Sequence, residues 1–345
     1  MRPARLRLGI VLVVVCVLFG ALVAAMDARR ATAMLGAASW GWIPIGLAAT
    51  AASYFCLSAG YALLNRIFGI ELGNRDLLEI GFVSTALNNL VSMAGVAGYS
   101  LRLLLLRRRG VAAGDVVGAS LVHSYLNHLV MLSLLPAGLL YLLVNHPLGR
   151  TRSVALAVAT GLATLVLAAT TWMLVSRRAR AGVAAGLAAV ARIVLRRDVG
   201  AALRDLDTRL GRGVEAIRNR PSVLGAPLLC VILDWATSVA ALGACFAAFG
   251  APLHPGVLLT GFAIGVTAGF LSMLPGGLGV QEGSMAAIYV LLGVDYERAV
   301  LAAMLFRILY YIVPFGVSLG LYARLMRGTV PVDTPSARNQ KVTGP

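Results

Sequence analysis

Charged residues are scarce in this sequence, and their scarcity excludes an ordinary soluble protein. They make up 13% of the 345 residues, against about 25% in a typical soluble domain. Hydrophobic residues make up 59% and the mean hydropathy is +0.85, which is more apolar surface than the interior of a chain this size can hide. We therefore expect lipid to be the solvent for much of the chain, and no stretch has the composition of a separate soluble domain.

Patterns typical of disulfide, metal and catalytic sites are also missing. The four cysteines lie inside apolar runs and form no C-x-x-C pair, so we interpret them as small hydrophobic side chains. His123 and His128 are spaced for different faces of a helix, and no carboxylate stands beside them at ligand spacing. No G-x-S-x-G or P-loop motif appears in a strand context either, and we therefore predict no metal, no cofactor and no enzyme activity.

Lysine occurs once, at Lys341, so the net charge of +16 comes almost wholly from arginine. The arginines stand in short blocks between apolar runs, which is the pattern of the cytoplasmic loops of membrane proteins. No aromatic-rich basic module accompanies them, and we therefore expect no nucleic-acid partner.

Six apolar stretches are long enough to cross a bilayer as helices. They are residues 8–26, 40–64, 116–144, 153–176, 221–249 and 298–323. The first resembles a signal peptide in part, but its length favours a retained helix. Two further apolar stretches, residues 80–101 and 256–292, are interrupted by glycine, asparagine or proline.

The arginine blocks decide how the two interrupted stretches run. If each stretch crossed the membrane once, the blocks within 102–109 and 177–220 would lie outside, whereas helical hairpins that dip in and return keep both blocks inside. The segment around Val91 also resembles the segment around Leu271, and three complete spans separate the two copies. An odd number of spans inverts the second copy, which is the architecture of many transporters.

The predicted fold is therefore an all-α integral membrane protein with about six transmembrane helices and two re-entrant hairpins in an inverted repeat. Residues 1–326 form one membrane domain, and residues 327–345, which include three prolines, form a disordered tail. We expect a bacterial-type inner membrane, with both termini and the segment 177–220 in the cytoplasm. That segment carries an apolar stripe, typical either of a solvated connecting helix or of a helix lying on an anionic leaflet.

Four charged residues lie deep in the apolar stretches, namely Arg102, Asp234, Glu282 and Arg307. A charge at mid-bilayer costs roughly 2.5–3.5 kcal/mol, so each of them needs a partner, a wet cavity or both. We expect Glu282 and Arg307 either to pair with each other or to contact a lipid headgroup. Asp234 is a candidate proton or headgroup site.

Glycine turns interrupt the two broken stretches at residues 95–98 and 275–279. Irregular backbone at membrane depth is tolerated only where it is buried or lines a cavity, so each turn indicates a binding site or a tight crossing of two chain segments. The freed backbone N–H groups at the start of the returning helix suit an anion such as phosphate. Gly261, Gly265 and Gly269, by contrast, recur every four residues and predict a flat face for helix packing.

Three segments resemble the signatures of the lysylphosphatidylglycerol synthase/flippase membrane region. They are residues 88–102 (NNLVSMAGVAGYSLR), residues 274–279 (LPGGLG) and residues 306–314 (FRILYYIVP). The resemblance extends over most of residues 8–323 and implies a flippase-like membrane domain. By this resemblance the substrate-binding positions are Asn89, Gly95, Gly98, Arg102, Pro275, Gly276, Gly277, Gly279, Arg307 and Tyr311, and Glu282 fits the P-G-G-x-G-x-x-E pattern of stand-alone relatives.

Bifunctional members of that family continue into a soluble aminoacyl-transferase domain, whereas this sequence ends at Pro345. We therefore expect no synthase activity. The expected function is to bind a phospholipid or lipid-linked precursor with an anionic headgroup and to move it between leaflets, with membrane lipids as partners. Two alternatives stay open: a proton-coupled secondary transporter of a small solute, and a non-catalytic membrane partner of a lipid-modifying enzyme or glycosyltransferase. A homo-oligomer also stays open.

Overall fold

The computed structural model describes residues 2–91, 96–145, 150–194 and 221–327, together with the single positions 208, 211, 215 and 219. Every regular element in these ranges is a helix, as the apolar stretches predict. Four helical segments are long and apolar enough to cross a membrane. They are α3 (Trp42–Ile67), α6 (Ala113–Asn145), the short 3-10 turn η1 with α10 (Pro221–Ala248), and α13 to α14 (Tyr296–Arg327). The protein is therefore an all-α membrane protein.

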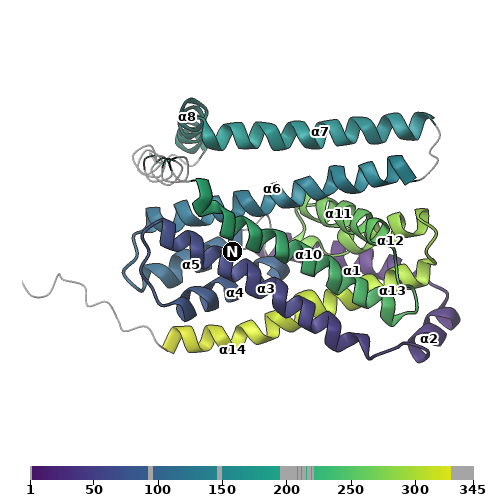
Figure 1. Ribbon diagram of the computed structural model, residues 1–345. Helices are drawn as coiled ribbons and strands as arrows, with labels where there is room; N and C mark the ends of the chain where they lie inside the picture. The colour runs from purple at the N-terminus through teal and green to yellow at the C-terminus, as the bar shows by residue number, and fades with distance from the viewer. Residues whose placement is uncertain are drawn as a thin grey trace, which may run out of the picture.

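The other two predicted spans are also helices, α1 (Arg2–Ala24) and α7 (Arg150–Val175). The apolar segments within these two helices, Val13–Ala24 and Thr160–Met173, are shorter than those of the four helical segments above. Figure 1 shows α7 lying along α6 at the edge of the bundle and leading into α8 (Arg177–Val194). The apolar stripe predicted beyond α8, and the predicted tail after residue 327, lie outside the continuous described ranges.

One short helix, α2 (Ala28–Gly36), is not anticipated by the sequence interpretation. Asp27 begins it, because its carboxylate accepts hydrogen bonds from the backbone N–H groups of Arg29 and Arg30 at 2.9 and 3.2 Å. An N-terminal cap of this kind satisfies backbone donors that have no partner within the helix.

Both interrupted stretches form helical hairpins. The first consists of α4 (Asn74–Val91) and α5 (Val96–Arg107), and the second of α11 (Pro255–Leu271), the 3-10 turn η2 (Pro275–Gly277) and α12 (Val280–Leu291). The two helices of each hairpin pack against each other. Figure 1 places the first hairpin toward one end of the helix bundle and the second toward the other end. The connection in the first hairpin, residues 92–95 with Gly95, lies outside the described residues.

Small residues bring the helices close together. The flat face predicted on α11 is confirmed, because a Cβ atom on Gly261, Gly265 or Gly269 would collide with side chains of α12. At the centre of the bundle α3 packs along α10, where Gly60 lies against Cys230. Close backbone approach of this kind is how helices associate in a lipid solvent, which offers no hydrophobic driving force.

The last span contains a local change of helix type. Between α13 (Tyr296–Arg307) and α14 (Val313–Arg327), residues Ile308–Ile312 form a π-helical turn. Pro314 has no N–H group, so the carbonyl of Tyr310 loses its α-helical donor, and the hydroxyl of Tyr54 donates to that carbonyl instead at 3.0 Å. The wider turn leaves Tyr310 and Tyr311 both buried. Single π turns are frequent at functional sites.

Candidate functional site

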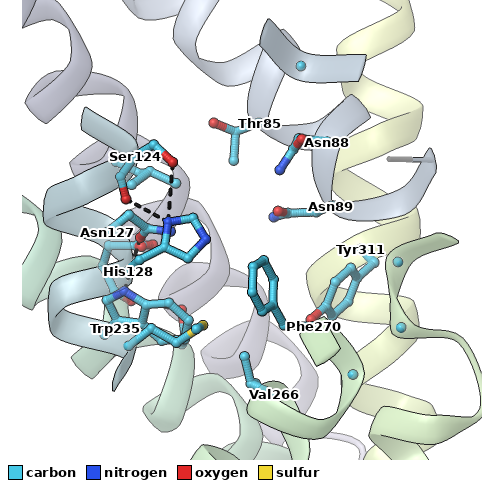
Figure 2. A pocket seen from close by; sticks show the side chains of 18 of the residues that line it. Thr85, Asn88, Asn89, Ser124, Asn127, His128, Trp235, Val266, Phe270 and Tyr311 are labelled. Atoms are coloured by element: carbon cyan, nitrogen blue, oxygen red, sulfur yellow. Dashed lines mark hydrogen bonds between the residues drawn. The ribbon is translucent and has the colours of Figure 1, made fainter. Parts of the chain in front are cut away.

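A polar cavity of about 200 Å³ lies where the two hairpins meet, between α3, α4, α5, α6, α10, α11 and the π turn. Figure 2 shows α4 forming one wall and α6 the opposite wall. Seven of the predicted site residues line it: Asn89, Gly98, Arg102, Asp234, Gly276, Gly277 and Tyr311. Pro275, Gly279, Glu282 and Arg307 do not line it, and Gly95 falls outside the described residues.

The second glycine turn is in direct contact with the first hairpin. Gly276 has a φ of +59°, in the left-handed region that glycine favours. A Cβ atom there would lie 2.7 Å from the carbonyl oxygen of Asn89 and 3.0 Å from that of Leu90, at the end of α4. Of the two readings that the sequence leaves open, a binding site and a tight crossing, the geometry at Gly276 fits the crossing.

Arg307 is bonded to the protein on several sides. It forms a buried ion pair with Glu282, and its guanidinium also donates to the carbonyl of Gly276 at 2.8 Å. The guanidinium carbon lies 4.1 Å from the centre of the Tyr311 ring. The predicted Glu282–Arg307 pair is therefore present, and it ties α13 and α12 to the glycine turn.

The start of α12 carries its own capping carboxylate. The N–H of Gly279 donates to Glu282 Oε2 at 2.8 Å, while the N–H groups of Gly277 and Leu278 bond to carbonyls within the turn. A carboxylate in the first turn of a helix brings negative charge to the end where an external anion would otherwise bind. The turn that the sequence suggests for phosphate thus already carries the carboxylate of Glu282.

Arg102 has a different environment, although it is 6% exposed and about as buried as Arg307. Its Nε donates to Ser84 Oγ at 2.8 Å, and its guanidinium carbon lies 4.0 Å from the centre of the Tyr61 ring. Among the described residues no carboxylate forms an ion pair with it. Arg102 therefore brings a positive charge to the cavity that no described acidic side chain neutralises.

His123 adds to this positive end without carrying charge itself. Its Nε2 lies 3.2 Å from the carbonyl oxygen of Leu57, so the proton belongs on Nε2. Its Nδ1 faces Arg102 Nη1 at 3.5 Å, where only a lone pair is compatible with the guanidinium donor. The network assigns a neutral imidazole that orients Arg102.

Two further polar atoms of α4 have no partner in the described structure. They are Thr85 Oγ1 and Asn88 Oδ1, both buried on the cavity wall. Figure 2 shows their side chains, with that of Asn89, across the cavity from Ser124 and His128. Buried polar atoms are ordinarily hydrogen-bonded, so this wall fits a polar ligand or water.

Asp234 is the second charged residue of the cavity and is 3% exposed. Its Oδ1 is hydrogen-bonded to Ser53 Oγ, and Ser53, Ser238 and Tyr310 bond to one another through their hydroxyl groups. Within the described ranges no cationic side chain pairs with Asp234. The carboxyl group therefore lies in a ring of hydroxyls.

The wall formed by α6 carries residues that the sequence places on separate faces. His123 and His128 nevertheless both line the cavity. The cavity borders α6 on two sides, with His123 on the side of Arg102 and His128 on the side of Phe270. The ring centres of His128 and Phe270 are 5.0 Å apart. Beside them Trp235 donates to Asn127 Oδ1 at 3.0 Å and joins α10 to α6.

Comparison with known proteins identifies the family of the chain. The protein-family model described as the lysylphosphatidylglycerol synthase TM region matches residues 6–318 of this chain. A relative, described as a UPF0104 membrane protein of Methanothermobacter thermautotrophicus, is 31% identical over 94 residues. That match covers 27% of this chain, and the chain spans about a quarter (26%) of the relative's length. Because the family match extends over nearly the whole helical bundle, the chain belongs to the lysylphosphatidylglycerol synthase TM region family.

Proposed function

We propose that this protein binds an anionic lipid headgroup in the central cavity and moves the lipid between membrane leaflets. The observation that carries the proposal is Arg102, a buried cation that lines the cavity and has no acidic partner among the described residues. An uncompensated charge in the membrane interior is expensive and marks a functional site. A phosphate group would supply the missing charge and would accept from the guanidinium in a bidentate manner.

The unpartnered atoms on α4 support the same assignment. Thr85 Oγ1 can donate to a phosphate oxygen, and Asn88 Oδ1 can accept from a headgroup hydroxyl. The membership in a family named for a lipid synthase agrees with a role in lipid handling. The headgroup would thus contact α4 and α5 rather than the second glycine turn, which packs against α4 and is capped by Glu282.

The proposal divides the two arginines between two tasks. Arg307, with Glu282, holds the second hairpin in place, and Arg102 contacts the headgroup. Asn89 has a mixed role, since its Nδ2 donates to Tyr54 at 3.2 Å while its side chain lines the cavity. Tyr311 likewise lines the cavity and bonds to Gln281.

We further propose that the protein has six spans and two re-entrant hairpins that open to opposite sides, with both termini in the cytoplasm. The hairpins lie toward opposite ends of the bundle and meet at Gly276, which supports this topology. The end of α5 and helix α8, whose sequences carry arginine blocks, lie at the same end of the bundle in Figure 1, which agrees with the positive-inside rule for cytoplasmic segments.

A leaflet-translocation assay tests the function. Protein is reconstituted in vesicles with a fluorescent phosphatidylglycerol, and the lipid that reaches the other leaflet is followed with an impermeant quencher. We expect Arg102→Gln to lose most of the protein-dependent movement, because one charge-assisted hydrogen bond contributes about 1.5–3 kcal/mol. The exposed Arg75 pairs with Glu79, and neither residue lines the cavity, so Arg75→Gln provides the control. Equal rates for Arg102→Gln and the control would contradict the proposal.

A second function, transport of a small anionic solute, is favoured by the size of the cavity. At about 200 Å³ it accommodates a phosphate-sized group with a few waters, and no acyl chain is required to fill it. Uptake of labelled inorganic phosphate into vesicles, with no movement of phosphatidylglycerol, would support this second candidate over the first.

A further inference from the structure

The hydrogen bonds around Asp234 can be used to count the hydrogen atoms that its carboxyl group and the neighbouring hydroxyls must supply. Four oxygen–oxygen contacts are short. They join Asp234 Oδ1 to Ser53, Ser53 to Tyr310, Tyr310 to Ser238, and Ser238 to the backbone carbonyl of Asp234. The last three measure 2.7, 2.7 and 2.8 Å. Oxygen–oxygen distances of this length are typical of hydrogen bonds, so each contact calls for a hydrogen.

The three hydroxyl groups carry one hydrogen each. If Asp234 is ionised, three hydrogens must serve four contacts, so either one hydroxyl shares its hydrogen between two acceptors or one pair of oxygens meets with lone pairs only. If the carboxyl group is protonated, a fourth hydrogen completes the set. The donations then run from Asp234 to Ser53, from Ser53 to Tyr310, from Tyr310 to Ser238, and from Ser238 back to the Asp234 carbonyl.

We infer that Asp234 is held as a protonated carboxylic acid in this conformation, and that headgroup binding at Arg102 is coupled to the proton on Asp234. The coupling rests on the proposed function, while the protonation rests on the hydrogen-bond geometry alone. With Asp234 neutral, the cavity carries the net positive charge of Arg102 and attracts an anion. Loss of the proton makes Asp234 negative, cancels that charge and favours release, so a proton and an anionic headgroup bind together.

Other titratable groups near the cavity bear on this assignment. Near Asp234 or lining the cavity are Tyr54 and Cys56 on α3, Tyr99 and Arg102 on α5, His123 and His128 on α6, Cys230 on α10, and Tyr310 and Tyr311 on the last span. Tyrosine and cysteine ordinarily lose protons above about pH 8, and arginine stays charged. The two histidines are the groups whose titration has to be separated from that of Asp234.

Infrared spectroscopy tests the protonation directly. A protonated carboxylic acid has a carbonyl stretch that a carboxylate lacks. The difference between wild type and Asp234→Asn at neutral pH should contain this band, and the absence of the band would overturn the inference. Tyr310→Phe is the second variant, since it keeps the carboxyl group and interrupts the ring. The band should persist there at a shifted frequency, and an unshifted band would show that the ring does not hold the proton.

Binding of a short-chain phosphatidylglycerol to the purified protein tests the coupling. Binding stabilises the protonated acid, so wild-type affinity should be greatest at low pH and fall as pH rises. Where Asp234 loses its proton, the fall should approach about tenfold per pH unit for one linked proton. In Asp234→Asn the affinity should no longer depend on pH, while His128→Gln should keep the dependence. His123→Gln should weaken binding at every pH, because it alters a contact of Arg102, and should keep the same pH dependence. A dependence that survives in Asp234→Asn, or that disappears in a histidine variant that still binds, would refute the coupling.

The two tests separate this inference from the proposed function. An infrared band without any binding of phosphatidylglycerol would count against the anionic lipid as substrate and would support the protonated Asp234. Binding that requires Arg102 but shows no band and no proton linkage would support the substrate and refute the role of Asp234.

Discussion

Breaking the buried pair of Glu282 and Arg307 should destabilise the protein far more than breaking an exposed pair. Their side chains are 2% and 5% exposed. Removing one partner of a buried pair leaves an uncompensated charge and costs about 3–5 kcal/mol. Arg307→Gln also removes a donor to the Gly276 carbonyl. The control is Arg75→Gln, because Arg75 is 79% exposed and its partner Glu79 keeps the ion pair with Arg324; a surface pair contributes about 0.2–1 kcal/mol.

Exchanging the two residues sharpens this prediction. In Glu282→Arg/Arg307→Glu the net charge is kept, but a glutamate at 307 cannot donate to the carbonyl of Gly276, and an arginine at 282 cannot accept from the N–H of Gly279. Each buried group left without a partner costs about 1–3 kcal/mol. We therefore expect the exchange to recover only part of the thermal stability lost in Arg307→Gln, measured as the midpoint of unfolding in detergent. Full recovery would show that charge balance alone matters and would refute the reasoning from the turn geometry.

Three further predictions concern the turn, the cavity and the topology. Gly276→Ala should lower thermal stability, because the φ of Gly276 is +59° and a Cβ atom there would lie 2.7 Å from the Asn89 carbonyl oxygen. The helical control Gly283→Ala should not lower it, because a Cβ atom on Gly283 would lie 3.6 Å from its nearest neighbour. Equal unfolding midpoints for the two variants would show that the hairpins do not meet at Gly276. Thr85→Val should keep or raise stability, since it removes a buried hydroxyl without a partner, yet weaken phosphatidylglycerol binding; unchanged binding would remove Thr85 from the site. A cysteine placed at Gly211 should react with a membrane-permeant thiol reagent and not with an impermeant one in intact cells, and the reverse would overturn the topology.

The helices and the hairpins were predictable because they depend on local features. Long apolar runs require helices in lipid, where every backbone polar group must bond internally, and the second glycine turn marks where residues 256–292 fold back. In the first interrupted run Gly98 lies inside α5, not in a turn, and Gly95 falls outside the described residues. The Glu282–Arg307 pair was also within reach, as one of two readings. The second glycine turn shows what the sequence cannot predict. The positive φ angles of its residues suit glycine, but whether a ligand or α4 occupies the adjacent space depends on the tertiary arrangement.

The division of roles between the two arginines was not predictable from the sequence. Arg102 and Arg307 look alike there, and only the fold shows that one meets a carboxylate and the other does not. The ring around Asp234 combines Ser53 with Ser238 and Tyr310 from three distant helical segments. The pair Asp234 and Ser238 was a usable signal, because polar residues four apart share one face of an apolar helix.

The central claim is that Arg102 holds an anionic lipid headgroup, and mass spectrometry of co-purified lipids tests it most directly. Wild type, Arg102→Gln and the control Arg75→Gln are purified in the same mild detergent, and the lipids that remain bound are measured per mole of protein. We predict that wild type and the control retain an anionic phospholipid or lipid-linked phosphate and that Arg102→Gln loses most of it while keeping its thermal stability within the range of the control. Retention of the same lipid by Arg102→Gln, in the same amount, would contradict the account.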